Sequence, residues 1–293
     1  MPETCRYKLT VAYDGSAFHG WQKQQPKDRP WPRTVEGELE QTLMRVLRQP
    51  SEAIGLLGAS RTDAGVHATG QVCHFNAQTP IPLERLCQAI NSRLPEDLEA
   101  RQVEVVHEDF DAIRDATDKQ YRYRVLNAPH RPLGLRHLVY HEWNPMELVA
   151  MRDAAARLVG THDVEGFASA AHGRQTTVRT IHDCQIEEHP LPGGYAAAGS
   201  PGRELHVVIS GSGFLYHMVR IVAGTMVEVG LGRIPPAQID QVLLTGDRRR
   251  AGPTLPARGL CLEWIRHAEP TSSRRREDAK TQSKAEAEGV GDV

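Results

Sequence analysis

The sequence predicts an α+β protein made of two halves, each built from strands and helices in a similar order. In the first half, hydrophobic periodicity gives the order strand, helix, strand, strand, helix, strand, which is typical of a split β-α-β, ferredoxin-like unit. The second half interleaves strands and helices in the same rough order, without a repeat in the sequence itself. We expect domains over residues 1–110 and 111–268, followed by a disordered tail over 269–293, where polar and charged residues show no periodicity.

The elements of the first half follow from alternation and from helical spacing. Residues 7–13 alternate polar and apolar side chains before the turn signal Asp14-Gly15, which predicts a strand. Apolar residues from Val35 to Leu47 recur at helical spacing after Thr34, a residue type that caps helices. Strands are predicted at 7–13, 54–57, 71–75 and 103–106, and helices at 35–47 and 83–90.

In the second half, the strand predicted over 119–125 alternates aromatic and basic residues. Tyr121 and Tyr123 therefore share one face of the strand, and Arg122 and Arg124 share the other. Further strands are expected at 180–187, 205–209 and 260–265, with a surface loop at 190–202, and helices from Asn144-Pro145 to Gly160, over 214–226 and over 235–244.

Composition limits the classes of function. The chain of 293 residues has a net charge of −2, so an RNA-binding protein of this composition must gather its basic residues on one face. Five widely spaced cysteines without a Cys-x-x-Cys pair indicate neither a zinc site nor a disulfide framework. No signal peptide is recognised, and the apolar stretch 214–229 contains charged residues. We expect a cytoplasmic protein without a membrane span.

The stretch Gly58–Val72 carries the most informative pattern. A predicted strand leads into a polar loop in which Arg61 and Asp63 lie two residues apart, so both point to one face if the extended conformation persists. A guanidinium beside a carboxylate favours the charged form, which a nucleophile or an anchor needs. The alternative is an aspartate that caps its own turn, with Arg61 as a structural partner.

Three strings of residues resemble the tRNA pseudouridine synthase A family. The string Arg-Thr-Asp-Ala-Gly-Val-His-Ala at 61–68 is similar to the family's catalytic signature. Tyr-Asp-Gly at 13–15, followed by Phe-x-Gly-Trp-Gln, matches its opening motif, and Gly-Phe-Leu-Tyr-His-Met-Val-Arg at 213–220 matches a later one. The resemblance extends from about Tyr7 to His267. It departs at Ile113, where the family often has arginine, and at Ile221, where it often has asparagine.

This resemblance implies an isomerase that converts uridine to pseudouridine in the anticodon stem-loop of tRNA, at family sites 38 to 40. It implies a homodimer that binds the anticodon arm of tRNA and needs no cofactor and no metal. It also implies two ferredoxin-like halves whose antiparallel sheets join, with the active cleft between them. The reaction breaks a carbon–nitrogen glycosidic bond and joins carbon 5 of the base to the sugar, so no electrons leave.

Roles for single residues come from the same resemblance. Asp63 is the expected nucleophile, by attack on the sugar, by assisting glycal formation or by addition to the ring. Arg61 displaces the target base and pairs with Asp63. Tyr121 stacks on the flipped uracil and serves as base or relay, although a phenol is a poor base unless its site shifts it. Arg220, expected with His217 inside the helix 214–226, supports Asp63 electrostatically.

Alternatives remain for several of these residues. Tyr121 suits the core of a strand, and Arg220 suits the edge of an apolar stripe from which it reaches solvent. His137 and His141 are interpreted as surface residues, not as metal ligands. The expected substrate-binding residues are Tyr121, Arg61, His67, Arg122 and Lys23, with Arg29, Arg33, Arg114, Lys119, Arg174, Arg179 and the run Arg248–Arg250 as further candidates for phosphate contacts.

Two other functions compete with the isomerase. A non-catalytic RNA-binding protein on the same fold would bind tRNA without changing it. A glycosidase-type hydrolase would pair Asp63 with a second carboxylate about 5–9.5 Å away. No second acid stands out near Asp63 in the sequence.

Overall fold

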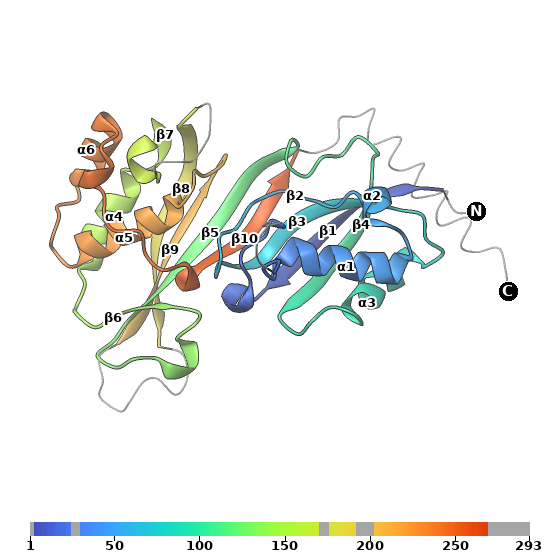
Figure 1. Ribbon diagram of the computed structural model, residues 1–293. Helices are drawn as coiled ribbons and strands as arrows, with labels where there is room; N and C mark the ends of the chain where they lie inside the picture. The colour runs from blue at the N-terminus through green and yellow to red at the C-terminus, as the bar shows by residue number, and fades with distance from the viewer. Residues whose placement is uncertain (1–2, 25–29, 170–175, 192–201, 269–293) are drawn as a thin grey trace. The chain divides into compact units, whose positions relative to one another are not determined.

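A computed structural model describes residues 3–24, 30–169, 176–191 and 202–268 (Figure 1). The strands that these residues form belong to one sheet in the order β4-β1-β3-β10-β5-β9-β8-β7, with β2 pairing with β3 and β6 with β5. Every pairing for which a register is given is antiparallel except β5 with β6. The expected α+β class is therefore confirmed, in the form of one large, mixed and mostly antiparallel sheet.

The chain divides into two compact units. Of the described residues, unit 1 holds those up to Thr117 and those from Trp264 to Ala268, and unit 2 holds those between Asp118 and Glu263. Two strands, β5 (Ala116–Asn127) and β10 (Leu260–His267), run from one unit into the other. The domains expected at 1–110 and 111–268 stay a prediction, and the expected tail at 269–293 lies outside the described residues.

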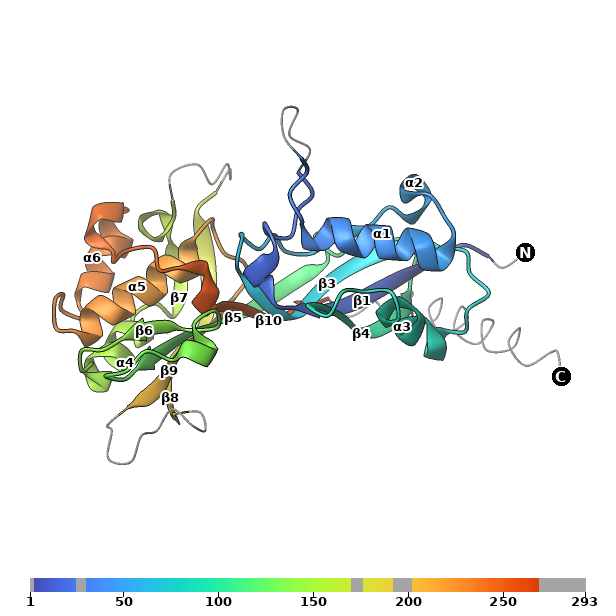
Figure 2. The same ribbon diagram turned by 60° about the horizontal axis from the view of Figure 1, so that its bottom comes forward.

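Unit 1 is built on a central strand whose apolar side chains are locked between two neighbours. Tyr7 of β1 lies opposite Phe75 and opposite Val105, and the Tyr7 and Phe75 rings stack at 5.2 Å. Helices α1 and α3 lie on one side of these strands (Figures 1 and 2). The elements are β1 (Cys5–Tyr13), α1 (Val35–Leu47), α2 (Ser51–Ile54), β2 (Leu57–Gly58), β3 (His67–Ala77), α3 (Leu83–Asn91) and β4 (Leu98–Val106).

Helices α1 and α3 begin where the sequence predicts. The Thr34 side chain accepts a hydrogen bond from the backbone of Gly37 and so caps α1, as expected. Leu39 and Leu43 on the apolar stripe of α1 are fully buried. Leu86 and Ile90 of α3 are also fully buried, and α3 begins directly after Pro82. The prediction succeeds for these helices because the spacing of apolar residues that defines each one lies within a single contiguous segment.

The strand predicted at 54–57 is wrong. Ile54 is the last residue of the short helix α2, and β2 covers only Leu57 and Gly58. Gly55 ends α2 in the left-handed conformation, with φ of +56°, and its backbone N–H bonds to the carbonyl of Ser51. A short apolar run is compatible with a buried strand and with the end of a buried helix. Here Gly55 ends a helix, because it takes the left-handed conformation that is common directly after helices.

Unit 2 packs helices against the strands that follow β5. Helices α4 and α5 contact each other and lie against β8 and β9 (Figures 1 and 2). Tyr121 and Tyr123 of β5 are buried and Arg122 and Arg124 are half-buried, as the alternation predicts. The elements are β6 (Tyr140–Glu142), α4 (Leu148–Ala156), β7 (Gly160–Asp163), β8 (Val178–Pro190), β9 (Arg203–Gly211), α5 (Met218–Gly230) and α6 (Gln238–Thr245).

The bounds of all three helices in unit 2 differ from the prediction. α4 ends at Ala156 and α5 at Gly230, while α6 begins at Gln238 and not at 235. α4 begins at Leu148 and not near Asn144, and Val149, expected on its apolar stripe, is 79% exposed. α5 begins at Met218, so His217 is its N-cap in the left-handed conformation, with φ of +62°. All of these differences concern helix ends, where capping geometry and not periodicity decides the boundary.

No helix formed by the described residues is long and apolar enough to cross a membrane. Most of the loop predicted at 190–202 lies outside the part of the chain that the structure describes.

Candidate active site

Thr62 anchors the loop that carries Asp63. Its side-chain hydroxyl lies 2.8 Å from the hydroxyl of Tyr13, and its carbonyl accepts a hydrogen bond from the backbone of Trp21 at 3.0 Å. Thr62 is buried, whereas Arg61 before it is exposed and Asp63 after it is half-buried. The two polar side chains of the motif therefore flank a fixed point.

Further hydrogen bonds hold both ends of this loop. Upstream, Gln71 donates its side-chain amide to the carbonyl of Ser60 at 2.6 Å. Downstream, Val66 donates its backbone N–H to the carbonyl of Asp63 at 3.1 Å, which closes a turn directly after the aspartate. The strand that leads into the loop ends at Gly58, so the loop itself and not a continued strand positions Arg61 and Asp63.

The segment after β1 lies directly against the motif loop. Gly20 has φ of +88°, and a Cβ built on it would lie 2.6 Å from the carbonyl oxygen of Thr62, so a side chain at this position has no space. Phe18 and Trp21 are 3% and 2% exposed, with the Tyr13 ring 6.3 Å from each of theirs. The aromatic residues of the opening motif pack in the interior of unit 1.

His67 supports the same region from the first residue of β3. Its Nδ1 accepts a hydrogen bond from the backbone of Gly15 at 3.1 Å and lies 3.2 Å from Asp14 Oδ1. His67 is buried and holds the Asp14–Ser16 turn to the end of the motif loop. Its expected contact with substrate stays a prediction.

In unit 2, Tyr121 is a buried side chain on β5, opposite Ile209 of β9. Its ring meets that of Phe214 edge-to-face, with 5.3 Å between centroids and 86° between planes. Phe214 belongs to the string at 213–220, so this pair joins Tyr121 to that motif. Aromatic pairs of this geometry fix the orientation of a ring.

Arg220 lies in the first turn of α5 and is held to the segment 252–255. Its Nε donates to the carbonyl of Leu255 at 2.7 Å, and the backbone N–H of Leu255 donates back to the carbonyl of Arg220. The close approach depends on Gly224, because a Cβ there would lie 1.9 Å from the carbonyl oxygen of Pro253. Thr225 adds a bond by accepting from Gly252 at 2.9 Å. The hydrogen bond to Leu255 therefore fixes the position of the Arg220 side chain.

His217 precedes α5 in a conformation that is strained for a residue with a side chain. Its ring stacks on that of Tyr216, with centroids 3.7 Å apart, and its Nδ1 lies 2.9 Å from Ser169 Oγ. These contacts compensate for the strain and hold the string 213–220 in place.

Comparison with known proteins assigns the family. The sequence profile described as tRNA pseudouridine synthase matches residues 9–115 and 154–267. The chain belongs to the tRNA pseudouridine synthase family. It is 41% identical to tRNA pseudouridine synthase A of Bacillus subtilis (strain 168) over 257 residues, which cover 88% of this chain and 97% of that one. It is 39% identical to tRNA pseudouridine synthase A of Acetivibrio thermocellus over 258 residues, with 87% and 96% coverage.

The family assigned from the motifs is thus confirmed, and with it the expected class of enzyme, an isomerase. This favours the isomerase over the RNA-binding protein and the hydrolase that the sequence left open. Among solved structures, an unknown protein from Galdieria sulphuraria covers 78% of this chain and 95% of its own, at a TM-score of 0.21 and 13% identity. That score is too low for an argument about fold.

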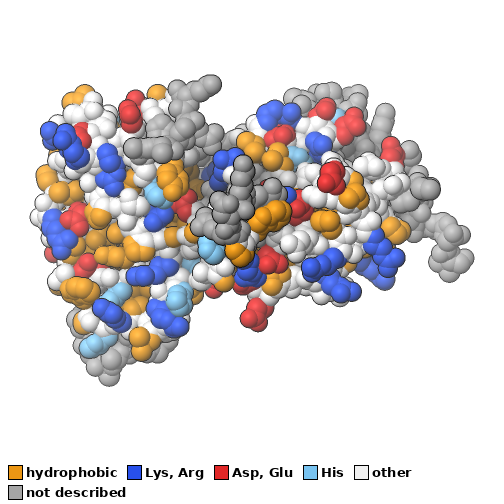
Figure 3. Space-filling view, viewed as in Figure 1, with side chains coloured by type: hydrophobic (Ala, Val, Ile, Leu, Met, Phe, Trp, Pro, Cys, Tyr) orange, Lys and Arg blue, Asp and Glu red, His pale blue; other side chains and the backbone are white. Residues whose placement is uncertain are grey.

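Several of the basic residues expected to contact tRNA in this tRNA pseudouridine synthase have acidic partners. Lys23 Nζ lies 2.6 Å from Glu40, and Arg122 lies 3.1 Å from Glu263. Similar pairs join Arg33 to Asp97, Arg114 to Asp115 and Arg249 to Asp247. On the face in Figure 3, Lys and Arg side chains lie in several separate groups interspersed with Asp and Glu. Arg29 and Arg174 lie outside the described residues.

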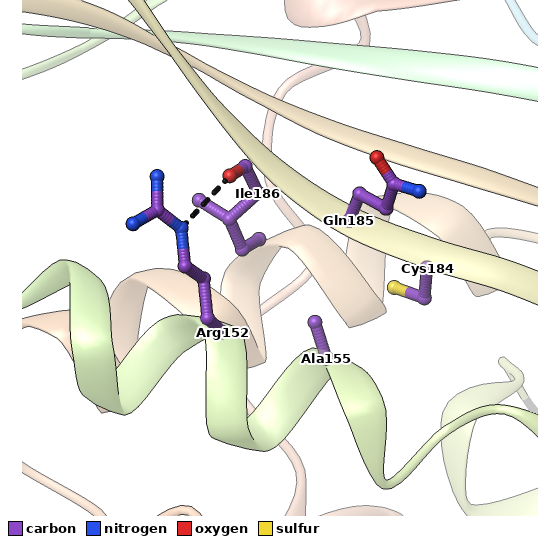
Figure 4. A pocket seen from close by; sticks show the side chains of 5 residues that line it. All are labelled: Arg152, Ala155, Cys184, Gln185 and Ile186. Atoms are coloured by element: carbon purple, nitrogen blue, oxygen red, sulfur yellow. Dashed lines mark hydrogen bonds between the residues drawn. The ribbon is translucent and has the colours of Figure 1, made fainter.

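A pocket of about 300 Å³ lies between α4 and β8 in unit 2 (Figure 4). It is lined by Arg152 and Ala155 of α4 and by Cys184, Gln185 and Ile186 of β8, and Arg152 Nε donates to the Ile186 carbonyl at 3.3 Å. Burial, with a smaller effect of nearby Asp183, raises the pKa of the Cys184 thiol to about 12. A thiol that stays protonated is a poor nucleophile, so we do not assign the pocket to the synthase reaction.

Sequence reasoning missed the supports of the motif loop. It gave roles to Arg61 and Asp63 but none to Thr62 between them or to Tyr13 at the end of β1, although both belong to the motifs. The available signal was weak: a threonine between two charged residues, and a tyrosine that ends an alternating strand. Their hydrogen bond joins residues 49 positions apart, and no local pattern reports such a distance.

Proposed function

We propose that this chain converts uridine to pseudouridine in the anticodon arm of tRNA, at family sites 38 to 40, and that Asp63 is the nucleophile. The observation that supports Asp63 most directly is the construction of its loop. Thr62 is bonded through both its hydroxyl and its carbonyl, so the half-buried carboxylate beside it starts from a fixed backbone. A preorganised nucleophile loses less freedom on reaching the transition state.

Three further residues complete the proposal. Arg61, exposed beside the fixed Thr62, displaces the target base. Tyr121, whose ring orientation is set by Phe214, stacks on the flipped uracil and serves as base or relay. Arg220, whose stem is held by Leu255, supplies positive charge to the reaction. These roles rest on the motif matches together with the local contacts of each residue.

Recognition of tRNA is the second part of the proposal. A uridine in a stem or tight loop must be flipped out of its stack, which costs a few kcal/mol. Contacts to phosphates supply binding energy for this step, and Arg122 and Lys23 are proposed to make them, while His67 is proposed to contact the substrate near the motif loop. A homodimer would present two copies of this surface to one tRNA, and the cytoplasm is where such a substrate is found.

The proposed architecture is a pair of ferredoxin-like halves. For unit 1 it is supported by the element order β1-α1-β2-β3-α3-β4 and by the strand order β4-β1-β3 with β2 paired to β3. A crystal structure of the enzyme would test it, because a half whose strands are joined in another order contradicts it.

The experiment that tests the substrate is a map of pseudouridine in tRNA. Unmodified tRNA is incubated with the purified protein, labelled chemically at pseudouridine and read by primer extension. We expect new pseudouridine in the anticodon arm and nowhere else in the tRNA. Pseudouridine confined to another arm would contradict the proposed substrate site while leaving the family assignment intact.

A further inference from the structure

A group of polar side chains lies on one face of the β8–β9 hairpin in unit 2. Glu187 of β8 lies directly opposite His206 of β9, and His189 lies opposite Glu204. Residues two apart on a strand point to the same side, and directly opposed residues of antiparallel strands do as well. The register therefore brings all four side chains to one face, although the two pairs lie in separate parts of the sequence.

Three of these residues direct ligand atoms toward one point. His189 Nε2 lies 3.1 Å from Glu187 Oε2, and His206 Nδ1 lies 3.8 Å from the same oxygen. One ligand atom from each of the three lies within 4.8 Å of the others. The two imidazole rings approach to 4.2 Å between centroids. Two imidazole nitrogens and a carboxylate oxygen form a donor set that suits a divalent transition metal.

His206 contributes an unsatisfied atom to this point. The residue is 7% exposed, and its Nδ1 is buried and makes no hydrogen bond within the described part of the chain. Buried polar atoms nearly always have a partner, so an orphan such as this one needs an explanation. A metal ion at the meeting point of Glu187 and His189 would supply the missing partner.

The second nitrogen of His206 has the support that metal-bound histidines usually have. Nε2 lies 2.8 Å from Glu204 Oε1, and the same oxygen accepts from Arg124 Nε at 2.5 Å. A carboxylate oxygen at this distance accepts the Nε2 proton of His206, which leaves the lone pair on Nδ1 directed at the point shared with Glu187 and His189.

We propose that Glu187, His189 and His206 form a binding site for a divalent transition-metal ion, zinc in the first instance, with Glu204 and Arg124 as positioning residues. Zinc bonds of 2.0–2.2 Å in a tetrahedron require ligand atoms about 3.4 Å apart. The side chains of Glu187 and His189, 43% and 44% exposed, have room to close that distance. The ion would tie β8 to β9 and stabilise the hairpin.

The test measures metal binding directly, with the full chain free of any histidine tag. Zinc chloride is titrated by calorimetry, and cobalt(II) is followed by its visible absorption, which reports a tetrahedral site with imidazole ligands. We expect one equivalent of each metal per chain. His189→Ala removes a half-exposed ligand and should lower zinc affinity more than about 100-fold, and Glu204→Gln should lower it about 10- to 100-fold. Zinc should raise the melting temperature of the wild type but not that of His189→Ala.

The matched control is His182→Ala. His182 is an exposed histidine on the same strand, bonded to Asp118 at 2.5 Å and not part of the cluster, so its removal should leave zinc affinity unchanged. The inference is overturned if the wild type binds no more zinc or cobalt than His189→Ala, or if His182→Ala lowers the affinity as much. The readout is independent of pseudouridine formation, so neither result affects the proposed reaction.

Discussion

The hydroxyl groups of Thr62 and Tyr13 share a buried hydrogen bond of 2.8 Å, which ties the loop of Asp63 to the last residue of β1. The carbonyl of Thr62 accepts a second bond from Trp21. These two bonds hold the backbone and side chain of Thr62 in place, with Arg61 and Asp63 as its neighbours in the sequence. This arrangement accounts for the uncharged residue between the two charged residues of the motif.

Thr62→Val keeps the shape of the side chain and removes its hydroxyl. Loss of a buried hydrogen bond should lower the free energy of unfolding by about 1–2 kcal/mol, measured by urea denaturation. Because the loop loses one anchor, kcat should fall while KM for tRNA changes little. The Tyr13→Phe and double variants complete a thermodynamic cycle. Strictly additive losses would show that the two hydroxyls do not interact.

Gly20→Ala should disrupt the contact between the opening motif and the loop. The new methyl group would lie 2.6 Å from the carbonyl oxygen of Thr62, so the loss of stability should be about 3 kcal/mol or more. Gly232→Ala is the matched control, because Gly232 also has a positive φ, of +70°, but no atom within 4 Å of its added Cβ. It should cost only about 1–2 kcal/mol. Equal losses in the two variants would contradict the steric account.

Tyr121→Phe separates the ring of Tyr121 from its hydroxyl. The ring contact with Phe214 is kept, so the variant should fold and bind tRNA like the wild type. If the hydroxyl serves in proton transfer, kcat should fall by about 10²-fold or more. Single-turnover kinetics with saturating enzyme measure this step. An unchanged rate would limit Tyr121 to stacking.

His74 should make the stability of the protein sensitive to mild acid. Its Nδ1 accepts from the backbone of Ala112 at 3.0 Å, and burial, then the charge of Arg6, lowers the pKa of His74. As the pH falls through about 6.5, His74 therefore takes up a proton in the unfolded chain while it stays neutral in the folded chain. The contribution of His74 to stability is complete above pH 6.5 and declines as the pH falls below that value.

The measurement compares melting temperatures at pH 7 and pH 5. His74→Gln retains an acceptor without a titrating ring, so it should lose less on acidification than the wild type. His137→Ala, which removes an exposed histidine, should behave like the wild type. Parallel losses in the wild type and in His74→Gln would refute the role of His74.

The parts of the fold that the sequence predicts are those encoded in contiguous residues. The spacing from Val35 to Leu47 gives α1 with its Thr34 cap, and alternation gives the two faces of β5 at Tyr121 and Arg122. The prediction is wrong at 54–57, because a four-residue apolar run lacks a full period of either structure and Gly55 ends a helix there.

For the candidate site, too, the sequence predicts local features and misses the contacts between distant residues. Motifs name Asp63, Tyr121 and Arg220, but the contacts that hold them join distant residues. The bond from Thr62 to Tyr13 and the docking of Leu255 on Arg220 depend on the folded chain. The cluster around His206 depends on the register of two strands. A shift of one residue in this register would place the cluster residues of β8 and those of β9 on opposite faces of the sheet.

The central claim is that the carboxylate of Asp63 performs the chemistry, and Asp63→Asn tests it most directly. The variant keeps the size of the side chain and removes its charge, and Asp109→Asn serves as a control at an exposed aspartate of unit 1. The measurement is tritium release from carbon 5 of uridine in labelled tRNA, alongside tRNA binding. We predict that Asp63→Asn binds tRNA and releases no tritium above background, while Asp109→Asn releases it at the wild-type rate. Wild-type release by Asp63→Asn would contradict the account.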